Sequence, residues 1–477
     1  MTPRKTFRAV TALTLSAAIA GCGDGLTDLN RNPNEPVEVG AEFLLPNAIE
    51  AAASRVHGSS LNMDLTGLWV QHYAESRFTE EDRYVVGDGT VSTHWSSFYA
   101  GPLQDLQEVI EQGEETSRPN VTAMGTIMKS WVMQVVTDLW GDTGYSEALQ
   151  GRSPQGSLTV RYDPQSEIYH DLLAKFASAS TMIQPGGPTI TQGDLIYSGD
   201  MAKWRRFANS MRLRAAMRLS GVEPSRAQTE AAAAIAAGVF SSNADNAVLW
   251  YQDNGIDVHP IFAYQRNRDD HTISATLVDT LKAFSDPRLG LYANPTAAGE
   301  YVGVRNGDTS DPPLNSFSRI GNYFSRANAP AMLMSYAEVL FLHAEAAERN
   351  WASGDPAALY RQGITAAMQN LGIAQAEIDA YLAQPRVQYA GGEAGLRQIW
   401  LQKWIVLFGN GPEAYAEWRR TGYPQLTPGP DALNEGRIPV RLPYPGSERS
   451  LNGSALAEAE SRQGGAGLND RLWWHRN

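Results

Sequence analysis

The segments APAMLMSYAEVLFLHAEAAERNW, at 329–351, and QKWIVLFGNGPEAYAEWRRTGYP, at 402–424, carry the strongest helical pattern of this chain. In the first segment, apolar residues recur at spacings of three and four, which predicts one face of a helix about five turns long. These residues are Leu333, Tyr336, Ala337, Leu340, Ala344 and Ala347. Asp355 suits an N-cap and Pro356 a first helical position, so a second helix is predicted to begin there.

Two more helices are predicted further along this stretch. One runs from about Glu393 to Phe408 and ends at the string Gly409-Asn410-Gly411, and the next covers 412–420, before Gly422. Two antiparallel helix pairs within about 95 residues match the spacing of tetratricopeptide arrays. The prediction is therefore an all-α fold, a tetratricopeptide-like array of helix pairs with long loop-rich insertions.

Together, the two segments resemble the C-terminal half of the SusD/RagB family. LNRNPNEP at 29–36, DLWGDTGYSEALQG at 138–151 and DPRLGLY at 286–292 resemble further family elements. The resemblance implies four tetratricopeptide-like helix pairs, a nutrient-binding lipoprotein of the bacterial outer membrane, and a TonB-dependent transporter of the SusC type as partner. Gly144 stands where the family would have Pro, and Asn350 where it would have Gly. Asn is the next best residue for a positive φ, so the second departure changes little.

The N-terminus has the features of a lipoprotein export signal. Basic residues precede an apolar stretch at 10–20 that is too short to span a bilayer, and Ile19-Ala20-Gly21-Cys22 resembles a lipobox. Cys22 is the only cysteine of the chain. We therefore expect a signal peptide at 1–21, lipid on Cys22, a tether at 22–40 and a helical body at 41–477. This predicts a lipid-anchored protein of the outer membrane that faces outside.

The net charge and the helical pattern of the body at 41–477 predict which partners it excludes and which side chains lie in its core. The net charge is −13, which argues against nucleic acid as a partner. The helix predicted at 204–219 interleaves arginines with apolar residues, and we expect those arginines on a solvated face, paired with acids. Apolar helix faces also predict a core position for Trp95, Trp131, Trp204, Trp404 and Trp418.

The segment 241–325 differs from the helical stretches, because it is rich in Asn, Asp, Gly and Pro, with aromatic residues spread among them. Only 273–284 has a helical pattern. A long loop-rich segment between regular helix pairs is usually functional or disordered, and the aromatic content argues against disorder. We therefore interpret 241–325 as the candidate ligand region.

Aromatic side chains in irregular stretches are the predicted ligand contacts. The apolar faces of sugar rings pack on Trp or Tyr, while rim hydroxyls bond Asn, Asp or Arg, and a peptide could use a similar cleft. The candidates are Arg77, Tyr84, Trp250, Tyr251, Tyr264, Arg266, Tyr292, Asn322 and Tyr323.

No catalytic motif is found: the eight histidines are scattered, and neither HExxH nor GxSxG occurs. We therefore predict a protein that is not an enzyme and expect neither a cofactor nor a metal. Asp245, Asp253, Asn254 and Asp257 could hold calcium, but Asx turns and helix caps explain the cluster better.

These observations predict a surface lipoprotein that binds oligomeric nutrients, glycan before peptide, and delivers them to a SusC-like transporter. Two alternatives remain at this point: a lipidated helical-repeat scaffold for envelope assembly, and a surface-anchored hydrolase. A scaffold would lack the aromatic insertion, and a hydrolase would need a carboxylate pair or a metal set in one cleft.

Overall fold

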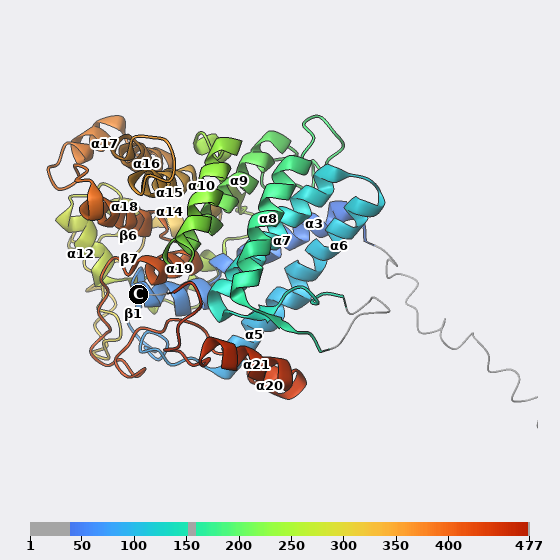
Figure 1. Ribbon diagram of the computed structural model, residues 1–477. Helices are drawn as coiled ribbons and strands as arrows, with labels where there is room; N and C mark the ends of the chain where they lie inside the picture. Colours follow the sequence, from blue (N-terminus) through green and yellow to red (C-terminus); the bar gives the residue numbers. More distant parts are fainter. Residues whose placement is uncertain (1–38, 151–158, 476–477) are drawn as a thin grey trace, which may run out of the picture. The chain divides into compact units, whose positions relative to one another are not determined.

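Helices dominate the chain in the computed structural model, which describes residues 39–150 and 159–475 (Figure 1). The signal peptide at 1–21, Cys22 and all but the last two residues of the tether lie outside the described residues. Backbone contacts gather 41–477 into one unit, which is described below.

The helices fall into three groups along the chain. The first group comprises α3 (Ala41–His57), the π-helix η1 (Ser59–Thr66), α4 (Gly67–Trp69), α5 (Asp88–Phe98), the π-helix η2 (Tyr99–Leu103), α6 (Gln104–Glu115), α7 (Pro119–Trp140), α8 (Gln165–Met182), α9 (Met201–Arg218), the 3-10 helix η3 (Leu219–Gly221) and α10 (Pro224–Ala237). The second comprises the 3-10 helix η4 (Asn243–Asp245), α11 (Pro260–Gln265), α12 (Ala275–Ala283), α13 (Leu289–Tyr292) and α14 (Asn322–Ser325). The third comprises α15 (Tyr336–Glu348), α16 (Pro356–Asn370), α17 (Gln375–Leu382), α18 (Gly392–Val406), α19 (Gly411–Thr421), α20 (Gly446–Leu451) and α21 (Gly453–Gln463).

Strands among the described residues are short and form antiparallel pairs between distant segments. These pairs are β1 (Tyr73–Glu75) with β5 (His271–Ile273), β2 (Thr143–Gly144) with β3 (Tyr162–Asp163), β4 (Ala247–Trp250) with β8 (Pro330–Met334), and β6 (Ala293–Asn294) with β7 (Arg319–Ile320). Three of the four pairs involve the loop-rich segment 241–325, so backbone hydrogen bonds hold that segment in place.

Successive helices pack against one another, as in tetratricopeptide arrays. Contacts join α6 to α7, α7 to α8, α8 to α9 and α9 to α10, and these helices lie side by side in Figure 1. In the C-terminal group α15 contacts both α16 and α18, and α18 contacts α19. The predicted all-α, tetratricopeptide-like fold is confirmed.

The predicted caps of the C-terminal helices are confirmed. The side chain of Asp355 accepts a hydrogen bond from the backbone N–H of Ala357, and Pro356 occupies the first turn of α16. Asn350 has a φ of 60°, the conformation for which Asn is the best substitute for Gly. Trp404 is buried as expected, with 1% of its surface exposed, whereas Trp418 is only partly buried.

One sequence prediction about a helix start is wrong. The segment before Tyr336, predicted as the first turns of a helix, forms strand β8, because β4 pairs with it and Ser335 caps α15 by accepting from the N–H of Glu338. Here pairing with a distant strand overrides the local apolar period.

The prediction of a solvated arginine face on α9 is wrong for Arg214 and Arg218, which are fully buried, although the expected pairing with acids is present. Arg214 donates to both carboxylate oxygens of Glu338 on α15, at 2.8 and 2.7 Å. Arg218 donates to Glu413 on α19 at 2.7 Å.

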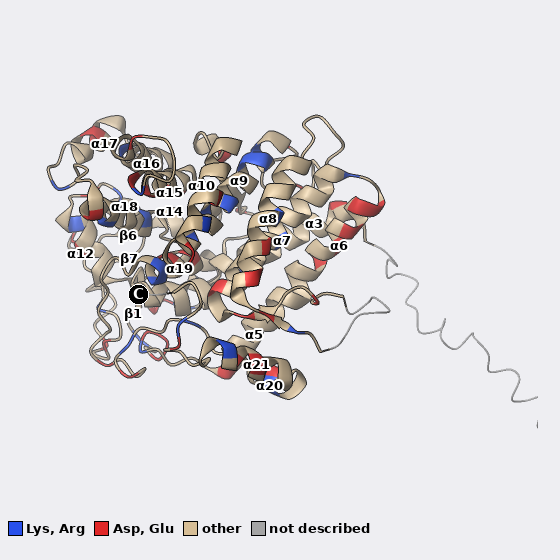
Figure 2. Ribbon diagram, in the orientation of Figure 1, with Lys and Arg blue, Asp and Glu red and all other residues tan. Residues whose placement is uncertain are grey.

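The same buried network continues through α18 and α19. Lys403 donates to Glu417 at 3.0 Å, and Arg420 donates to both oxygens of Glu345 at 2.8 and 2.6 Å. Acidic and basic segments lie close together where these helices meet (Figure 2). This network, hereafter the core ion network, ties α9, α15, α18 and α19 together across about 200 residues of sequence.

Candidate functional site

The predicted ligand residues divide into buried and surface positions. Tyr84, Tyr251 and Tyr292 are buried, with at most 7% of their surface exposed. The hydroxyl of Tyr251 lies 2.7 Å from that of Ser54, and the ring of Tyr292 stacks on Phe408 with centroids 4.7 Å apart. These three side chains support the site region from the inside rather than presenting a ring to solvent.

A loop at 76–81 presents the most unusual surface side chain of the region. Phe78 is 67% exposed and has a φ of 54°, a left-handed conformation that is an outlier for a bulky residue. Such backbone strain persists only where the surrounding structure imposes it, and it is often found at functional sites.

Reciprocal hydrogen bonds close this loop at its base. The backbone N–H of Glu75 donates to the Asp82 carboxylate, and the N–H of Asp82 donates to the Glu75 carboxylate, each at 3.1 Å. Asn306 also donates to Asp82 at 2.7 Å, and Ser76 donates to the carbonyl of Asp270. The base of the loop is therefore tied down on both sides while Phe78 extends into solvent.

One missed residue, Arg268, lies between Phe78 and the predicted Tyr264. The guanidinium carbon of Arg268 lies 5.3 Å from the ring centre of Phe78 and 5.6 Å from that of Tyr264. Asp270 holds Arg268 in place by accepting two hydrogen bonds, at 3.0 and 2.6 Å. Phe78, Arg268 and Tyr264 thus form one continuous aromatic and cationic surface.

A polar hollow adjoins Phe78. It encloses about 680 Å³ and is lined by Ser76, Arg77, Phe78, Thr79, Thr309 and Asp311. Arg77 is exposed and pairs with Asp311 at 2.9 Å. An exposed aromatic ring next to hydroxyl, carboxylate and guanidinium groups is a combination that suits a sugar, because the faces of a sugar ring are apolar and its rim hydroxyls are polar.

A second hollow, of about 770 Å³, is lined mainly by apolar side chains. Tyr292, Tyr323 and Phe324 contribute to it, together with Pro330 and Met332 of β8. Trp250 pairs directly with Pro330 across the β4–β8 ribbon, so both side chains lie on the same face. Trp250 is 54% exposed, so this face of the ribbon presents an aromatic ring to solvent.

Helix α11 has residues in both regions. Ile261, near its start, lines the apolar hollow, and Tyr264, three residues later, contacts Arg268 beside Phe78. Ile261 is buried, so α11 contributes to both regions without joining them at the surface. We name the residues Phe78, Tyr264, Trp250 and Tyr323 together the aromatic face.

The remaining predicted residues are Arg266 and Asn322. Arg266 is exposed at the end of α11, with its guanidinium 6.0 Å from the ring centre of Phe262. Asn322 is exposed on α14 and accepts a hydrogen bond from Asn294. Of the other predicted residues, Arg77 and Trp250 are exposed, and Tyr264 and Tyr323 are partly buried.

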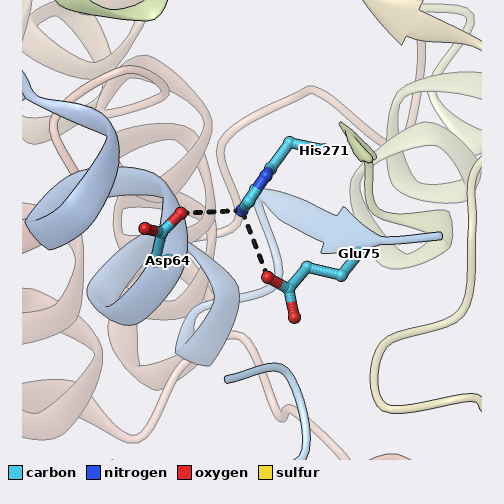
Figure 3. A group of neighbouring side chains, drawn as sticks. All are labelled: Asp64, Glu75 and His271. Atoms are coloured by element: carbon cyan, nitrogen blue, oxygen red, sulfur yellow. Dashed lines mark ion pairs between the residues drawn. The ribbon is translucent and has the colours of Figure 1, made fainter. Parts of the chain in front are cut away.

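A group of titratable side chains lies directly behind Tyr264. His271 Nε2 lies 3.0 Å from a carboxylate oxygen of Asp64 and 3.5 Å from one of Glu75, as Figure 3 shows. Its Nδ1 lies 3.0 Å from the hydroxyl of Tyr264 and 3.5 Å from Asp270. We name Asp64, Glu75 and His271 the carboxylate–histidine cluster.

Burial and neighbouring charge shift the acid–base properties of the cluster. Burial raises the pKa of Glu75 to about 9, although His271 opposes the shift. Burial by itself lowers the pKa of His271, but the Asp270 and Asp64 carboxylates outweigh it and raise this pKa to about 10. The imidazole is therefore a cation held between acids when no other ion is bound.

Sequence reasoning missed Phe78, Arg268 and the cluster. One signal for Phe78 was available: it is a single large apolar residue inside the polar run SRFTEEDR at 76–83. The cluster had no such signal, because His271 of β5 lies about 200 residues after Asp64 of η1 and Glu75 of β1. The Asn254 and Asp257 pair weighed for calcium forms an Asx turn, with Asn254 accepting from the N–H groups of 256 and 257.

The fold and its surface define a class, that of helical-repeat binding proteins with a loop-built aromatic face. Residues 33–445 match a family model named SusD-like and described as starch-binding and associating with the outer membrane. The chain therefore belongs to the SusD-like family. No curated protein matches it in sequence.

Solved structures agree with this assignment. A chitin-binding protein is 33% identical, with 92% of this chain and 100% of that chain covered and a TM-score of 0.82. A chitin-binding SusD homologue from Flavobacterium johnsoniae is 25% identical, covers 91% of this chain and 99% of that one, and has a TM-score of 0.81. A SusD homologue from Bacteroides uniformis is 25% identical, with coverage of 91% and 100% and a TM-score of 0.80.

Across 39–150 and 159–475, none of the helices combines the length and apolar character needed to span a bilayer.

Proposed function

We propose that this protein binds an oligosaccharide on the aromatic face, as a surface lipoprotein that hands its ligand to a SusC-like TonB-dependent transporter. The observation that carries the proposal is Phe78, an exposed ring held in a strained backbone conformation beside the polar hollow of Arg77, Thr79 and Asp311. Family membership and the chitin-binding relatives support glycan as the ligand class.

The arrangement suits an oligomer rather than a single sugar. Phe78 and Trp250 are two exposed rings on different segments of the aromatic face, and we propose that they contact different sugar units of one oligomer. Hydrogen-bonding groups accompany the Phe78 end, while the Trp250 end is more apolar. We propose binding without bond cleavage, in keeping with relatives described as binding proteins.

The test is calorimetry on the purified full chain with N-acetylglucosamine oligomers and, separately, with maltooligosaccharides. Loss of one stacking ring costs about 1 kcal/mol, so Phe78→Ala and Trp250→Ala are each expected to weaken binding by roughly fivefold. Phe43→Ala is the matched control, because Phe43 is a 74% exposed ring at the start of α3, away from the aromatic face.

Equal affinity in wild type, Phe78→Ala and Trp250→Ala would place the ligand elsewhere. Release of shorter oligosaccharides by the purified protein would contradict binding without cleavage. If neither glycan series binds but an oligopeptide does, the ligand class is peptide.

Anchor and partner are tested separately. Cys22→Ala is expected to release the protein from membranes in a strain without the transporter gene, because lipid on Cys22 is the proposed anchor. A SusC-like transporter is expected to co-purify with the tagged wild-type protein. Membrane retention of the variant would overturn the anchor, and absence of any co-purified transporter would overturn the partner.

A further inference from the structure

A group of three potential metal ligands, Asp64, Glu75 and His271, is built into the part of the fold behind the aromatic face. Each comes from a different element: Asp64 from the π-helix η1, Glu75 from β1 and His271 from β5. Glu75 and His271 are directly opposite in the β1–β5 register, which directs both side chains to the same face. The ligand atoms lie within 4.8 Å of one another.

Two atoms of this cluster are left without hydrogen bonds. His271 is 1% exposed, and neither its Nε2 nor Oδ1 of Asp64 makes a hydrogen bond, although they lie 3.0 Å apart. In Figure 3 the Nε2 atom faces both the Asp64 and the Glu75 carboxylates. The two atoms are thus an ion pair without a hydrogen bond of good geometry, whereas buried polar atoms are normally hydrogen-bonded.

The distances match those between ligands that share one small cation. Zinc bonds of about 2.0–2.2 Å to nitrogen and oxygen in a tetrahedral arrangement separate ligand atoms by roughly 3.3 Å. The two separations from His271 Nε2 are 3.0 and 3.5 Å. Asp64 keeps a quarter of its side-chain surface exposed, which leaves a route from solvent.

Groups outside the cluster already orient its members. The second oxygen of Glu75 accepts from the N–H of Asp82 at 3.1 Å. His271 Nδ1 faces the Tyr264 hydroxyl and the Asp270 carboxylate, and Asp270 is itself held by Arg268. A carboxylate behind a histidine is the usual support for an imidazole that binds metal through its other nitrogen.

We propose that Asp64, Glu75 and His271 form a site for a divalent cation of the zinc type, in which the metal replaces the proton on His271 Nε2. The imidazole ligand favours zinc and similar transition metals over calcium, which takes oxygen ligands. This inference departs from the sequence expectation of no metal, and it does not depend on the proposed glycan binding.

The test uses the full lipidated chain in detergent, purified with a tag that contains no histidine and treated with a chelator. Zn²⁺ is titrated at pH 7 in competition with a coloured indicator. We expect one Zn²⁺ per chain, at least tenfold weaker binding in Asp64→Asn and complete loss in His271→Gln. His170→Gln is the matched control, since His170 pairs with the single carboxylate of Glu223 at 2.9 Å, and we expect unchanged binding.

Asp64→Asn guards against a folding artefact, because Asp64 is partly exposed and its replacement preserves size. The proposal would be overturned if the wild type bound no Zn²⁺, or if Asp64→Asn and His271→Gln bound Zn²⁺ as tightly as the wild type. The cluster would then be an ion pair only. Displacement of Zn²⁺ by an equal concentration of Ca²⁺ would overturn the assigned metal class. In crystals soaked with Zn²⁺, an anomalous peak between the three side chains is expected, and a peak only elsewhere would contradict the site.

Discussion

The core ion network and the carboxylate–histidine cluster are both buried groups of charges, yet their balance differs. In the core ion network every acid has a cationic partner, and Arg420 and its neighbours outweigh burial so that the pKa values of Glu345 and Glu417 are lowered. Around His271 the acids outnumber the cations, and burial raises the pKa of Glu75 to about 9 and that of Asp82 to about 6.

This difference separates structural charges from charges available for binding. Balanced charges hold helices in one arrangement, even though Glu413 Oε1 and Arg218 Nε of the core ion network make no hydrogen bond. An excess of acid around a buried imidazole, close to an exposed and strained Phe78, is what a binding region would contain. Four expectations follow from the comparison, in order of decreasing effect.

Breaking the core ion network is expected to have the largest effect. Arg214→Met removes both hydrogen bonds that Arg214 donates to Glu338 and leaves this buried carboxylate with Lys403 alone, 3.8 Å away, which should lower the free energy of unfolding by about 3–5 kcal/mol. Denaturant titration of the variant measures this. Asp64→Asn, in the carboxylate–histidine cluster, is the comparison and should change the value by under about 1 kcal/mol. Similar losses in both variants would erase the distinction between the two regions.

Acid should weaken the core ion network specifically. Because the folded-state pKa values of Glu345 and Glu417 lie below the ordinary glutamate value of 4.5, their contribution to stability is present above pH 4.5 and is lost as pH falls further. Glu75 has the opposite sign, since its raised pKa makes its contribution decline as pH rises from 4.5 towards about 9. Each unit of pKa difference corresponds to about 1.4 kcal/mol.

Unfolding free energies measured between pH 5 and pH 3 test this sign. Wild type and Glu75→Gln should lose stability in parallel over that range, whereas Glu417→Gln should show a shallower decline. An equally steep decline in Glu417→Gln would show that other carboxylates cause the acid sensitivity.

Relieving the strain at Phe78 should stabilise the fold slightly. A left-handed backbone costs a bulky residue about 1–2 kcal/mol, and Asn tolerates it better. The lost contact between the ring and Arg268 offsets about 0.5–1 kcal/mol of this. Phe78→Asn should therefore raise the free energy of unfolding by roughly 0.5 kcal/mol while weakening glycan binding. A clear loss of stability would mean that the ring is a structural residue.

The smallest effect is expected at Arg77. Its ion pair with Asp311 is exposed at both ends, so Arg77→Ala should change the free energy of unfolding by less than about 1 kcal/mol. If Arg77 contacts the ligand through the polar hollow, calorimetry of the same variant will show weaker glycan binding. Unchanged affinity would remove Arg77 from the proposed contacts.

Much of the helical fold was predictable because its signals are local. The cap at Asp355, the proline at 356 and the positive φ of Asn350 follow from residue type and position alone. The apolar faces of Trp131 and Trp404 correctly predicted buried rings. The start of α15 was not predictable, since β8 exists only through its pairing with β4, about 80 residues earlier.

The site was predictable only by region. Loop composition and aromatic content directed attention to 241–325 and to Arg77, but they could not separate the exposed Trp250 from its buried neighbour Tyr251. Side chains alternate along a strand, so Trp250 and the following Tyr251 point to opposite faces. The pairing of β4 with β8 decides which of these faces is open to solvent.

The sequence by itself determined the helical class, most of the helix ends and the family resemblance, because helix periodicity, caps and motifs act over a few residues. Only the tertiary structure decided that Arg214 and Arg218 lie in the core, that Phe78 extends into solvent, and that Asp64, Glu75 and His271 meet. The physical reason is that burial and charge balance depend on contacts between distant segments. The spacing of residues along the chain does not predict which distant segments meet.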